Sequence, residues 1–296
     1  MRLLSALTVD GPRLAAKVDG GILLFSEAED LLRKADMVLP RTLQEAFASD
    51  HSFAELESQA AVILADPDIQ AYLHPEEEIT LASLFTPRNI LCVGLNYKDH
   101  AAESNVSPPQ QPVFFAKWIN SASAPNAPIV LPPDTSEVDY EAELAVVIGR
   151  RCRGASADSA LDFVAGYSCM NDVSARDFQR ADGQWERAKS QDTFGPFGPY
   201  LVTKEDIPDP QGLFIRCAVN GRTLQNSNTR QMIFGVRDLI AFISRGITLY
   251  PGDLISTGTP HGVGFAQKPP VFLKNGDEVV VEIQEIGRLS NPVTVM

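Results

Sequence analysis

Acidic and apolar side chains alternate along Val138-Asp-Tyr-Glu-Ala-Glu-Leu-Ala-Val-Val-Ile148. Successive side chains of a β-strand point to opposite faces, so Glu141 and Glu143 would share one face. Two carboxylates this close repel each other unless a cation lies between them. The stretch therefore predicts a strand with one acidic face turned into a cleft and one apolar face against a core, the latter formed by Val138, Tyr140, Ala142, Leu144 and Val146.

A simpler interpretation of the same stretch is the solvated face of an antiparallel edge strand. A second stretch, Ala165-Gly-Tyr-Ser-Cys-Met-Asn-Asp172, favours the cation site. It is an apolar, strand-like run that ends in Asn171 and Asp172, before a segment with helical character. A third carboxylate at the end of a buried strand has few structural reasons to be there. Its nearest competitor as a ligand is Asp139, for which we expect a structural role.

Composition limits the classes of partner. The chain has 296 residues, 44% of them hydrophobic, which suffices for one large domain with a smaller one. Its net charge of −13 argues against nucleic acid and anionic membranes, because both would be repelled. No 18 apolar residues run together, and the apolar run after Met1 is short for a signal peptide, so we expect neither a membrane segment nor secretion.

The four cysteines at positions 92, 152, 169 and 217 form no CxxC pair. We interpret them as free, mostly buried thiols of a reducing compartment, and therefore expect a cytoplasmic protein.

Residues 1–85 carry no visible chemistry. Short apolar runs broken at Asp10-Gly-Pro12 and Asp19-Gly-Gly21 predict β-hairpins, and helical spacing follows from Glu27 to about Ala65. The proline-marked turn before Pro87 predicts a boundary between a small N-terminal cap or docking domain, 1–85, and a catalytic domain, 86–296. His51 and His74 lie among charged residues, and we expect both to be solvated.

Three further polar groups are candidates for catalysis. Asn89 to Leu95 reads as a buried strand followed by His100 and Glu103, which share one face if this segment is helical. A single histidine is more often a packing or surface residue, and Lys189, in a Gly/Pro-rich loop, is a surface lysine by default. The sequence leaves these alternatives open.

The glycine-rich turn Ser256-Thr-Gly-Thr-Pro-His-Gly-Val-Gly264 lacks the spacing of a nucleotide-binding loop. Its small side chains suit a substrate carboxylate, held by backbone N–H groups such as that of Gly258 and by the Thr259 hydroxyl. His261 is a weaker candidate in the same turn. No nucleophile elbow is present, which argues against acyl-enzyme chemistry.

Taken together, five ordered motifs resemble the fumarylacetoacetate hydrolase family over about residues 86–296. The N-terminal region resembles the subgroup with a small leading domain, which includes bacterial oxaloacetate decarboxylases. The motifs are Asn96-Tyr-Lys-Asp-His-Ala-Ala-Glu103, Asp139-Tyr-Glu-Ala-Glu143, Asn171-Asp-Val-Ser-Ala-Arg-Asp-Phe-Gln179, Lys189-Ser-Gln-Asp-Thr193 and Ser256 to Gly264.

The resemblance implies an α+β, mostly β fold with a rolled mixed β-sandwich as catalytic domain, a homodimer, and 2-oxo acid substrates. The segment from Lys117 to Ile129 lacks a glycine often found in the family, which leaves the substrate's size open. The implied roles are metal binding for Glu141, Glu143 and Asp172, a catalytic pair on a lid for His100 and Glu103, and substrate contacts or catalysis for Gln179, Lys189, Gly258 and Thr259.

An all-oxygen ligand set without His or Cys selects a hard cation, Mg²⁺ or Mn²⁺. Such an ion would stabilise the enolate that forms when a 2-oxo acid loses a C–C bond. The first hypothesis is therefore metal-dependent C–C cleavage, by hydrolysis of an acylpyruvate or decarboxylation of oxaloacetate. The alternatives are an isomerase or tautomerase that uses the same enolate, and a non-catalytic metal-stabilised binding protein.

Overall fold

The structure is a computed structural model that describes residues 1–48 and 52–296. Its α-helices are α1 (Glu29–Lys34), α2 (Leu43–Ala46), α3 (Ser52–Leu64), α4 (Lys98–Glu103), α5 (Arg176–Asp182), α6 (Glu186–Lys189) and α7 (Val236–Ser244). Its strands are β1 (Arg2–Thr8), β2 (Gly11–Val18), β3 (Gly21–Leu24), β4 (Leu73–His74), β5 (Ile90–Gly94), β6 (Val113–Lys117), β7 (Ala122–Ser123), β8 (Ile129–Leu131), β9 (Val138–Asp139), β10 (Ala142–Ile148), β11 (Val164–Asn171), β12 (Ser174–Ala175), β13 (Gly195–Thr203), β14 (Phe214–Val219), β15 (Arg222–Asn228), β16 (Leu254–Ser256), β17 (Glu278–Ile283) and β18 (Gly287–Val295).

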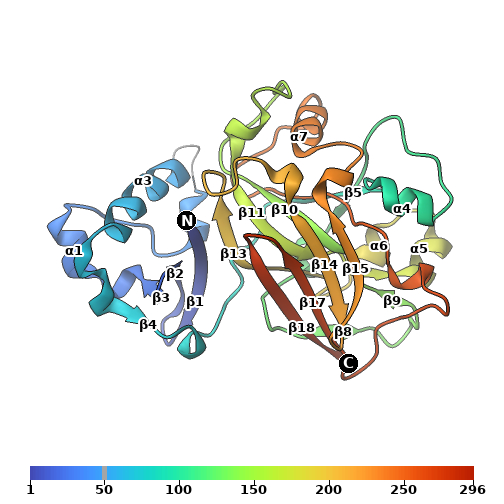
Figure 1. Ribbon diagram of the computed structural model, residues 1–296, viewed down its shortest axis with the longest axis horizontal. Helices are drawn as coiled ribbons and strands as arrows, with labels where there is room; N and C mark the ends of the chain where they lie inside the picture. Colours follow the sequence, from blue (N-terminus) through green and yellow to red (C-terminus); the bar gives the residue numbers. More distant parts are fainter. Residues whose placement is uncertain (49–51) are drawn as a thin grey trace.

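Two large sheets dominate the described chain (Figure 1). One has eleven strands in the order β4-β3-β2-β1-β13-β11-β10-β16-β5-β6, with β7 beside β13. The other has five, in the order β15-β14-β17-β18-β8. Most neighbours are antiparallel, but β16 pairs with β5 and β18 with β8 in parallel. The predicted class, α+β and mostly β with mixed sheets, is confirmed.

The acidic stretch lies in the middle of the larger sheet. Strand β10 has β11 on one side and β16 on the other, and all seven of its residues are buried. The solvated-edge interpretation is therefore wrong. The predicted apolar face is confirmed, since Val138, Tyr140, Ala142, Leu144 and Val146 all belong to one buried cluster, shared with β14 and β17 of the smaller sheet.

The prediction of one strand from Val138 to Ile148 needs a correction, because the chain bends at Tyr140 and Glu141. Before the bend β9 pairs with β12, and after it β10 pairs with β11. The bend is held by hydrogen bonds to the next turn: the Glu141 N–H donates to Asn171 Oδ1 at 2.9 Å, and the Glu141 carbonyl accepts from the Asp172 N–H at 2.9 Å. The acidic strand is thereby fixed to the end of β11.

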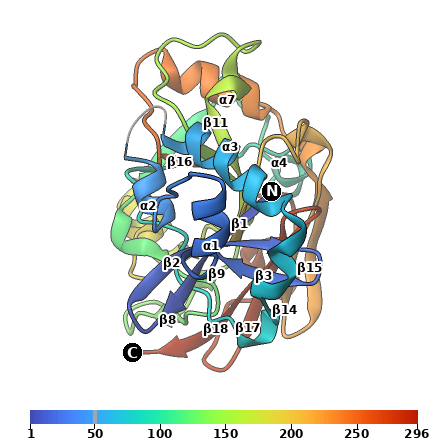
Figure 2. The same cartoon turned by 90° about the vertical axis from the view of Figure 1, so that its left-hand side faces the viewer.

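The N-terminal elements extend the larger sheet. The hairpins predicted at Gly11 and Gly21 are present, and β1 pairs with β13 through Leu3 and Leu201. Helices α1 to α3 lie together at this end of the molecule (Figure 2). They cover a second buried cluster, in which the ring of Phe47 stacks on that of Phe53 with centroids 5.2 Å apart. The division at residue 85 stays a prediction, since both parts share one sheet.

The two N-terminal histidines have separate outcomes. His51 lies outside the described residues. The His74 side chain is 34% exposed, and its Nε2 lies 2.7 Å from Glu27 Oε2, so it is a half-exposed residue with a surface partner.

Candidate metal centre and active site

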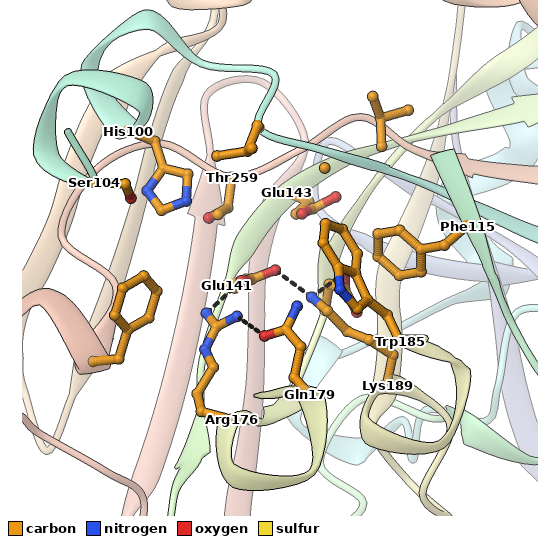
Figure 3. A pocket seen from close by; sticks show the side chains of 15 residues that line it. His100, Ser104, Phe115, Glu141, Glu143, Arg176, Gln179, Trp185, Lys189 and Thr259 are labelled. Atoms are coloured by element: carbon orange, nitrogen blue, oxygen red, sulfur yellow. Dashed lines mark hydrogen bonds and ion pairs between the residues drawn. The ribbon is translucent and has the colours of Figure 1, made fainter. Parts of the chain in front are cut away.

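Three carboxylates converge where two strands of the larger sheet meet. Glu143 lies on strand β10, and Glu141 is the residue directly before this strand. Asp172 directly follows β11, the antiparallel neighbour of β10. One oxygen from each residue lies within 4.8 Å of the other two, and all three side chains are buried. Figure 3 shows Glu141 and Glu143 at the centre of the cavity. The three residues predicted as metal ligands therefore form one buried cluster of hard oxygen donors that could hold a divalent cation.

Two buried lysines neutralise part of this charge. The Lys189 ammonium group donates to Glu141 Oε2 at 2.7 Å and to Asp172 Oδ2 at 2.8 Å (Figure 3). The Lys117 ammonium group donates to Asp172 Oδ1 at 2.7 Å. Lys189, a surface lysine by default from the sequence, thus lies at the centre of the site. The role of Lys117, the last residue of strand β6, was not predicted from the sequence.

Arg176 is a third cation that sequence reasoning missed. Its Nε donates to Asp139 Oδ2 at 2.8 Å and its Nη2 donates to Glu141 Oε1 at 2.5 Å. Asp139 also accepts from the Gly264 N–H at 2.6 Å. Asp139 therefore holds Arg176 and the glycine-rich turn in place, which is the structural role expected for it.

Glu143 differs from the other two carboxylates because it forms no ion pair with any described residue. Its Oε2 accepts from the Ser256 hydroxyl and, at 2.8 Å, from the Gly258 N–H. The Gly258 amide, predicted to bind substrate, is thus engaged by the protein. Burial and the nearby Asp172 and Glu141 carboxylates raise the pKa of Glu143 well above its usual value. A bound divalent cation would supply the positive charge that Glu143 lacks.

The pKa of Glu141 moves in the opposite direction. Burial alone would raise it, but Lys189 and Arg176 offset the burial and lower it to about 2. For Lys189 the signs are reversed: burial alone would lower its pKa, but Asp172 and Glu141 raise it. Glu141 and Lys189 are therefore a charged pair at neutral pH.

The predicted pair His100 and Glu103 is assembled on α4, at the edge of the same cavity. His100 Nδ1 lies 3.3 Å from Glu103 Oε2. Glu103 is fixed in turn by the Gly262 N–H, which donates to both of its oxygens at 2.9 and 3.1 Å. The helix thus contacts the glycine-rich turn, and Nε2 of His100 makes no hydrogen bond to a described residue.

The remaining residues predicted to contact substrate differ in whether they line the cavity. Gln179 lines the cavity and its Oε1 accepts from Arg176 Nη1 at 2.9 Å, which leaves its N–H groups for a ligand. Thr259 also lines it, but its hydroxyl already donates to the Ala142 carbonyl at 3.0 Å. His261 is absent from the lining: its side chain is 46% exposed and pairs with Asp99 at 3.0 Å.

The cavity itself is small, about 160 Å³. Figure 3 shows its two unlike sides, with His100 and Ser104 on one side of the carboxylates and Trp185 and Phe115 on the other. Its lining is completed by the apolar residues Val93, Gly94, Leu95 and Phe265 and by the charged and polar groups already described.

Comparison with known proteins gives a consistent result. Residues 89–294 match the family described as fumarylacetoacetate (FAA) hydrolase C-terminal. The mitochondrial oxaloacetate tautomerase Fahd2a of Rattus norvegicus is 46% identical over 264 residues, which are 88% of this chain and 82% of the relative. The mitochondrial oxaloacetate tautomerase FAHD2A of Homo sapiens is 46% identical over 267 residues, with the same two shares.

Solved structures with the same fold carry different enzyme names. The fumarylacetoacetate hydrolase EaFAH from psychrophilic Exiguobacterium antarcticum is similar with a TM-score of 0.79 and 33% identity, covering all of both chains. The 5-carboxymethyl-2-hydroxymuconate delta-isomerase from Mycobacterium smegmatis has a TM-score of 0.76 and 34% identity, covering 100% of this chain and 99% of that one.

The expected cytoplasmic location is wrong, because the curated relatives are labelled mitochondrial. The observation behind it holds: Cys92, Cys152, Cys169 and Cys217 are free and buried. Free thiols indicate a reducing compartment, but they do not indicate which reducing compartment it is.

Among the described residues no helix is long and apolar enough to cross a membrane. The buried triad, the fold and the match over residues 89–294 agree with one another. The chain belongs to the fumarylacetoacetate hydrolase family.

Proposed function

We propose that this chain is a divalent-metal-dependent tautomerase that interconverts the keto and enol forms of oxaloacetate. The observation that supports this most strongly is the buried triad Glu141, Glu143 and Asp172 beside a small cavity, in a chain 46% identical to named oxaloacetate tautomerases. The tautomerase alternative thereby moves ahead of C–C bond cleavage, because keto–enol exchange breaks no C–C bond and needs no attacking water.

The triad suits Mg²⁺ or Mn²⁺, since its donors are all carboxylate oxygens and lie within 4.8 Å of one another. When bound, such an ion withdraws charge from the 2-oxo oxygen and stabilises the negative charge that develops on enolisation. The residues that would hold it are Glu141, Glu143 and Asp172. Lys117 and Lys189 would orient Asp172, because each donates to one of its oxygens.

The charge of the site favours an anionic ligand once a metal is present. Four buried carboxylates face three buried cationic side chains, so the cluster alone carries one excess negative charge when all groups are ionised. A divalent cation reverses that sign. A substrate carboxylate that loses its water on binding would then interact with the positive charge of the site. The free N–H groups of Gln179 can donate to one of its oxygens.

Tautomerisation requires one proton to leave the enol oxygen and another to be added to C3. His100 is placed for such a transfer, because its imidazole borders the cavity and Glu103 holds its Nδ1. Its Nε2 is the ring nitrogen that can take up or release a proton at the substrate. Glu103 acts by orienting the ring, since the Gly262 N–H occupies both of its oxygens.

A second candidate is C–C bond cleavage, and the same His100–Glu103 pair supports it. As a base, His100 could activate water for attack on the distal carbonyl of an acylpyruvate, and the C–C bond would then break with the enolate of pyruvate as leaving group. Decarboxylation of oxaloacetate would need no water, only stabilisation of the enolate that forms as CO₂ leaves. Pyruvate release separates both of these reactions from tautomerisation, because a tautomerase forms no pyruvate.

The metal assignment and the reaction can be tested together. Enol-oxaloacetate absorbs in the ultraviolet, and we expect its decay to accelerate with Mg²⁺ and to return to the uncatalysed rate with a chelator. Asp172→Asn should weaken Mg²⁺ binding in calorimetry by more than about 100-fold and remove the acceleration, since loss of a direct ligand exceeds the usual effect of an outer-shell partner. Asp134→Asn, which changes an exposed carboxylate outside the cavity lining, is the control. Unchanged Mg²⁺ affinity in Asp172→Asn would refute the ligand set.

The role of His100 predicts a graded series of variants. His100→Ala should lower kcat for tautomerisation by about 10²–10⁴-fold, the usual contribution of a positioned acid–base group. Glu103→Gln should lower it by a smaller factor, because this residue orients the imidazole. Lys98→Ala changes an exposed residue of the same helix and should have little effect. If His100→Ala lost no more activity than Lys98→Ala, His100 would be a packing residue.

We also propose that the protein is a homodimer. Strand β6 ends the larger sheet and, within the described part of the chain, pairs with β5 alone. Apolar side chains are exposed on and beside it, including Phe114 (38%), Trp118 (57%) and Ile119 (54%). An unpaired, apolar sheet edge favours association. Sedimentation should give twice the chain mass of 32.2 kDa. Ile119→Arg should shift it toward one chain, whereas Val38→Arg, at a site 88% exposed, should not. A single-chain mass at micromolar concentration would contradict the dimer.

A further inference from the structure

One wall of the active-site cavity is a single large aromatic side chain. Trp185 lines the cavity beside Phe115, and the two rings meet edge to face with centroids 5.2 Å apart and planes 73° apart. Figure 3 shows both rings on the side of the carboxylates away from His100. Aromatic rings in this arrangement are rigid and offer no charge for a carboxylate. They limit the cavity on that side and offer no partner for the carboxylates of a ligand.

The Trp185 ring lies unusually close to the backbone of strand β5. A Cβ added to Gly94 would be 2.7 Å from Cζ3 of the indole, which is closer than real Cβ atoms come to other atoms. The absence of a side chain at Gly94 therefore makes room for the indole at this strand. Phe115 on the neighbouring strand β6 packs edge to face against the same ring. The wall is set by contacts with two sheet strands.

The same wall is connected to the charged centre. The Lys189 N–H donates to the Trp185 carbonyl at 2.9 Å, so the tryptophan begins the helical turn that carries Lys189. The Lys189 ammonium group binds Glu141 and Asp172 and lies 5.2 Å from the centre of the Phe115 ring. The distance between the carboxylates and the indole is consequently fixed by the fold. A ligand held at the carboxylates meets the ring on this side of the cavity.

The opposite side of the cavity is polar. His100 and Ser104 lie there (Figure 3), and the buried Ser104 hydroxyl has no hydrogen-bond partner among the described residues. A second carboxylate of a short substrate can accept hydrogen bonds on this side. A longer chain that extends toward the aromatic side meets Trp185.

We propose that Trp185, supported by Gly94 and Phe115, is the specificity-determining residue that restricts this site to 2-oxo acids of about four carbons. This rests on the proposed function and names its substrate class. The cavity volume of about 160 Å³ is consistent with it, because pockets for drug-sized ligands typically measure about 300–1,000 Å³.

The proposal is tested with 2-oxo dicarboxylic acids of increasing chain length: oxaloacetate, 2-oxoglutarate and 2-oxoadipate. The C3 protons of oxaloacetate are the most acidic of the series, so the length dependence of the wild type is compared with that of Trp185 variants, where this intrinsic difference cancels. Enolisation removes a proton from C3, and in D₂O the returning proton is a deuteron, so NMR reports kcat/KM for every member. With Mg²⁺ we expect wild-type kcat/KM to fall by about 10–200-fold for each added methylene. Trp185→Ala should reduce the difference between the four- and six-carbon acids by at least about tenfold, and Trp185→Phe by less.

Binding can be measured without catalysis. The chain has two tryptophans, and Trp118, which is 57% exposed, is not in the cavity lining. In a Trp118→Phe background the emission of Trp185 alone reports occupation of the cavity by each acid with Mg²⁺. We expect affinity to decrease with chain length.

A double-mutant comparison tests the wall itself. Gly94→Ala should lower the melting temperature when Trp185 is present and should be tolerated in Trp185→Ala, because the clash involves the indole. This comparison also shows whether Trp185→Ala folds, and Trp185→Leu replaces it if it does not.

The outcomes separate the two proposals. Equal length dependence in the wild type and in the folded Trp185 variant would overturn the size limit and leave the tautomerase intact. Graded binding without accelerated exchange of any acid would refute the tautomerase and leave the size limit intact. Both proposals are supported if exchange is fast for oxaloacetate and the longer acids gain when the ring is removed.

Discussion

The fold of this protein depends on holding three like charges together inside the sheet. Carboxylates within 4.8 Å of one another repel by roughly 3 kcal/mol per pair at an effective dielectric constant of 20. Three such pairs approach the whole stability of an ordinary domain, about 5–15 kcal/mol. Lys117, Lys189 and Arg176 offset part of this repulsion, but none of them pairs with Glu143. The arrangement is understandable if a divalent cation completes it.

The surrounding structure makes this charged centre rigid. Strand β10 carries one face into the core shared with the smaller sheet and the other into the core beneath the N-terminal helices. The bend at Glu141 is tied to the end of β11, and the glycine-rich turn is tied to Asp139 and Glu103. The carboxylates are thus fixed by the sheet, and helices α4, α5 and α6, which carry other groups of the cavity, are tied to the site by hydrogen bonds. Such fixed placement is what electrostatic stabilisation of an enolate requires.

Much of the site could be predicted from local patterns. The alternation of side chains along a strand predicted that Glu141 and Glu143 share one face, and the end of an apolar run indicated Asp172. The spacing of three residues predicted that His100 lies beside Glu103. Lys117 and Arg176 escaped notice because their partners lie 55 and 37 residues away in the chain. The bend at Tyr140 escaped for the same reason, since it follows from β9 and β10 pairing with different strands. The wall at Trp185 depends on contact with Gly94, which no local pattern encodes.

The central claim, that Glu141, Glu143 and Asp172 together hold one divalent cation, is tested most directly by anomalous X-ray diffraction from crystals of the protein grown with Mn²⁺. We expect a single strong anomalous peak at about 2.0–2.3 Å from one oxygen of each of the three carboxylates, with Lys117 still at Asp172. A peak elsewhere, or an ammonium group of Lys189 between the carboxylates and no peak at saturating Mn²⁺, would contradict it.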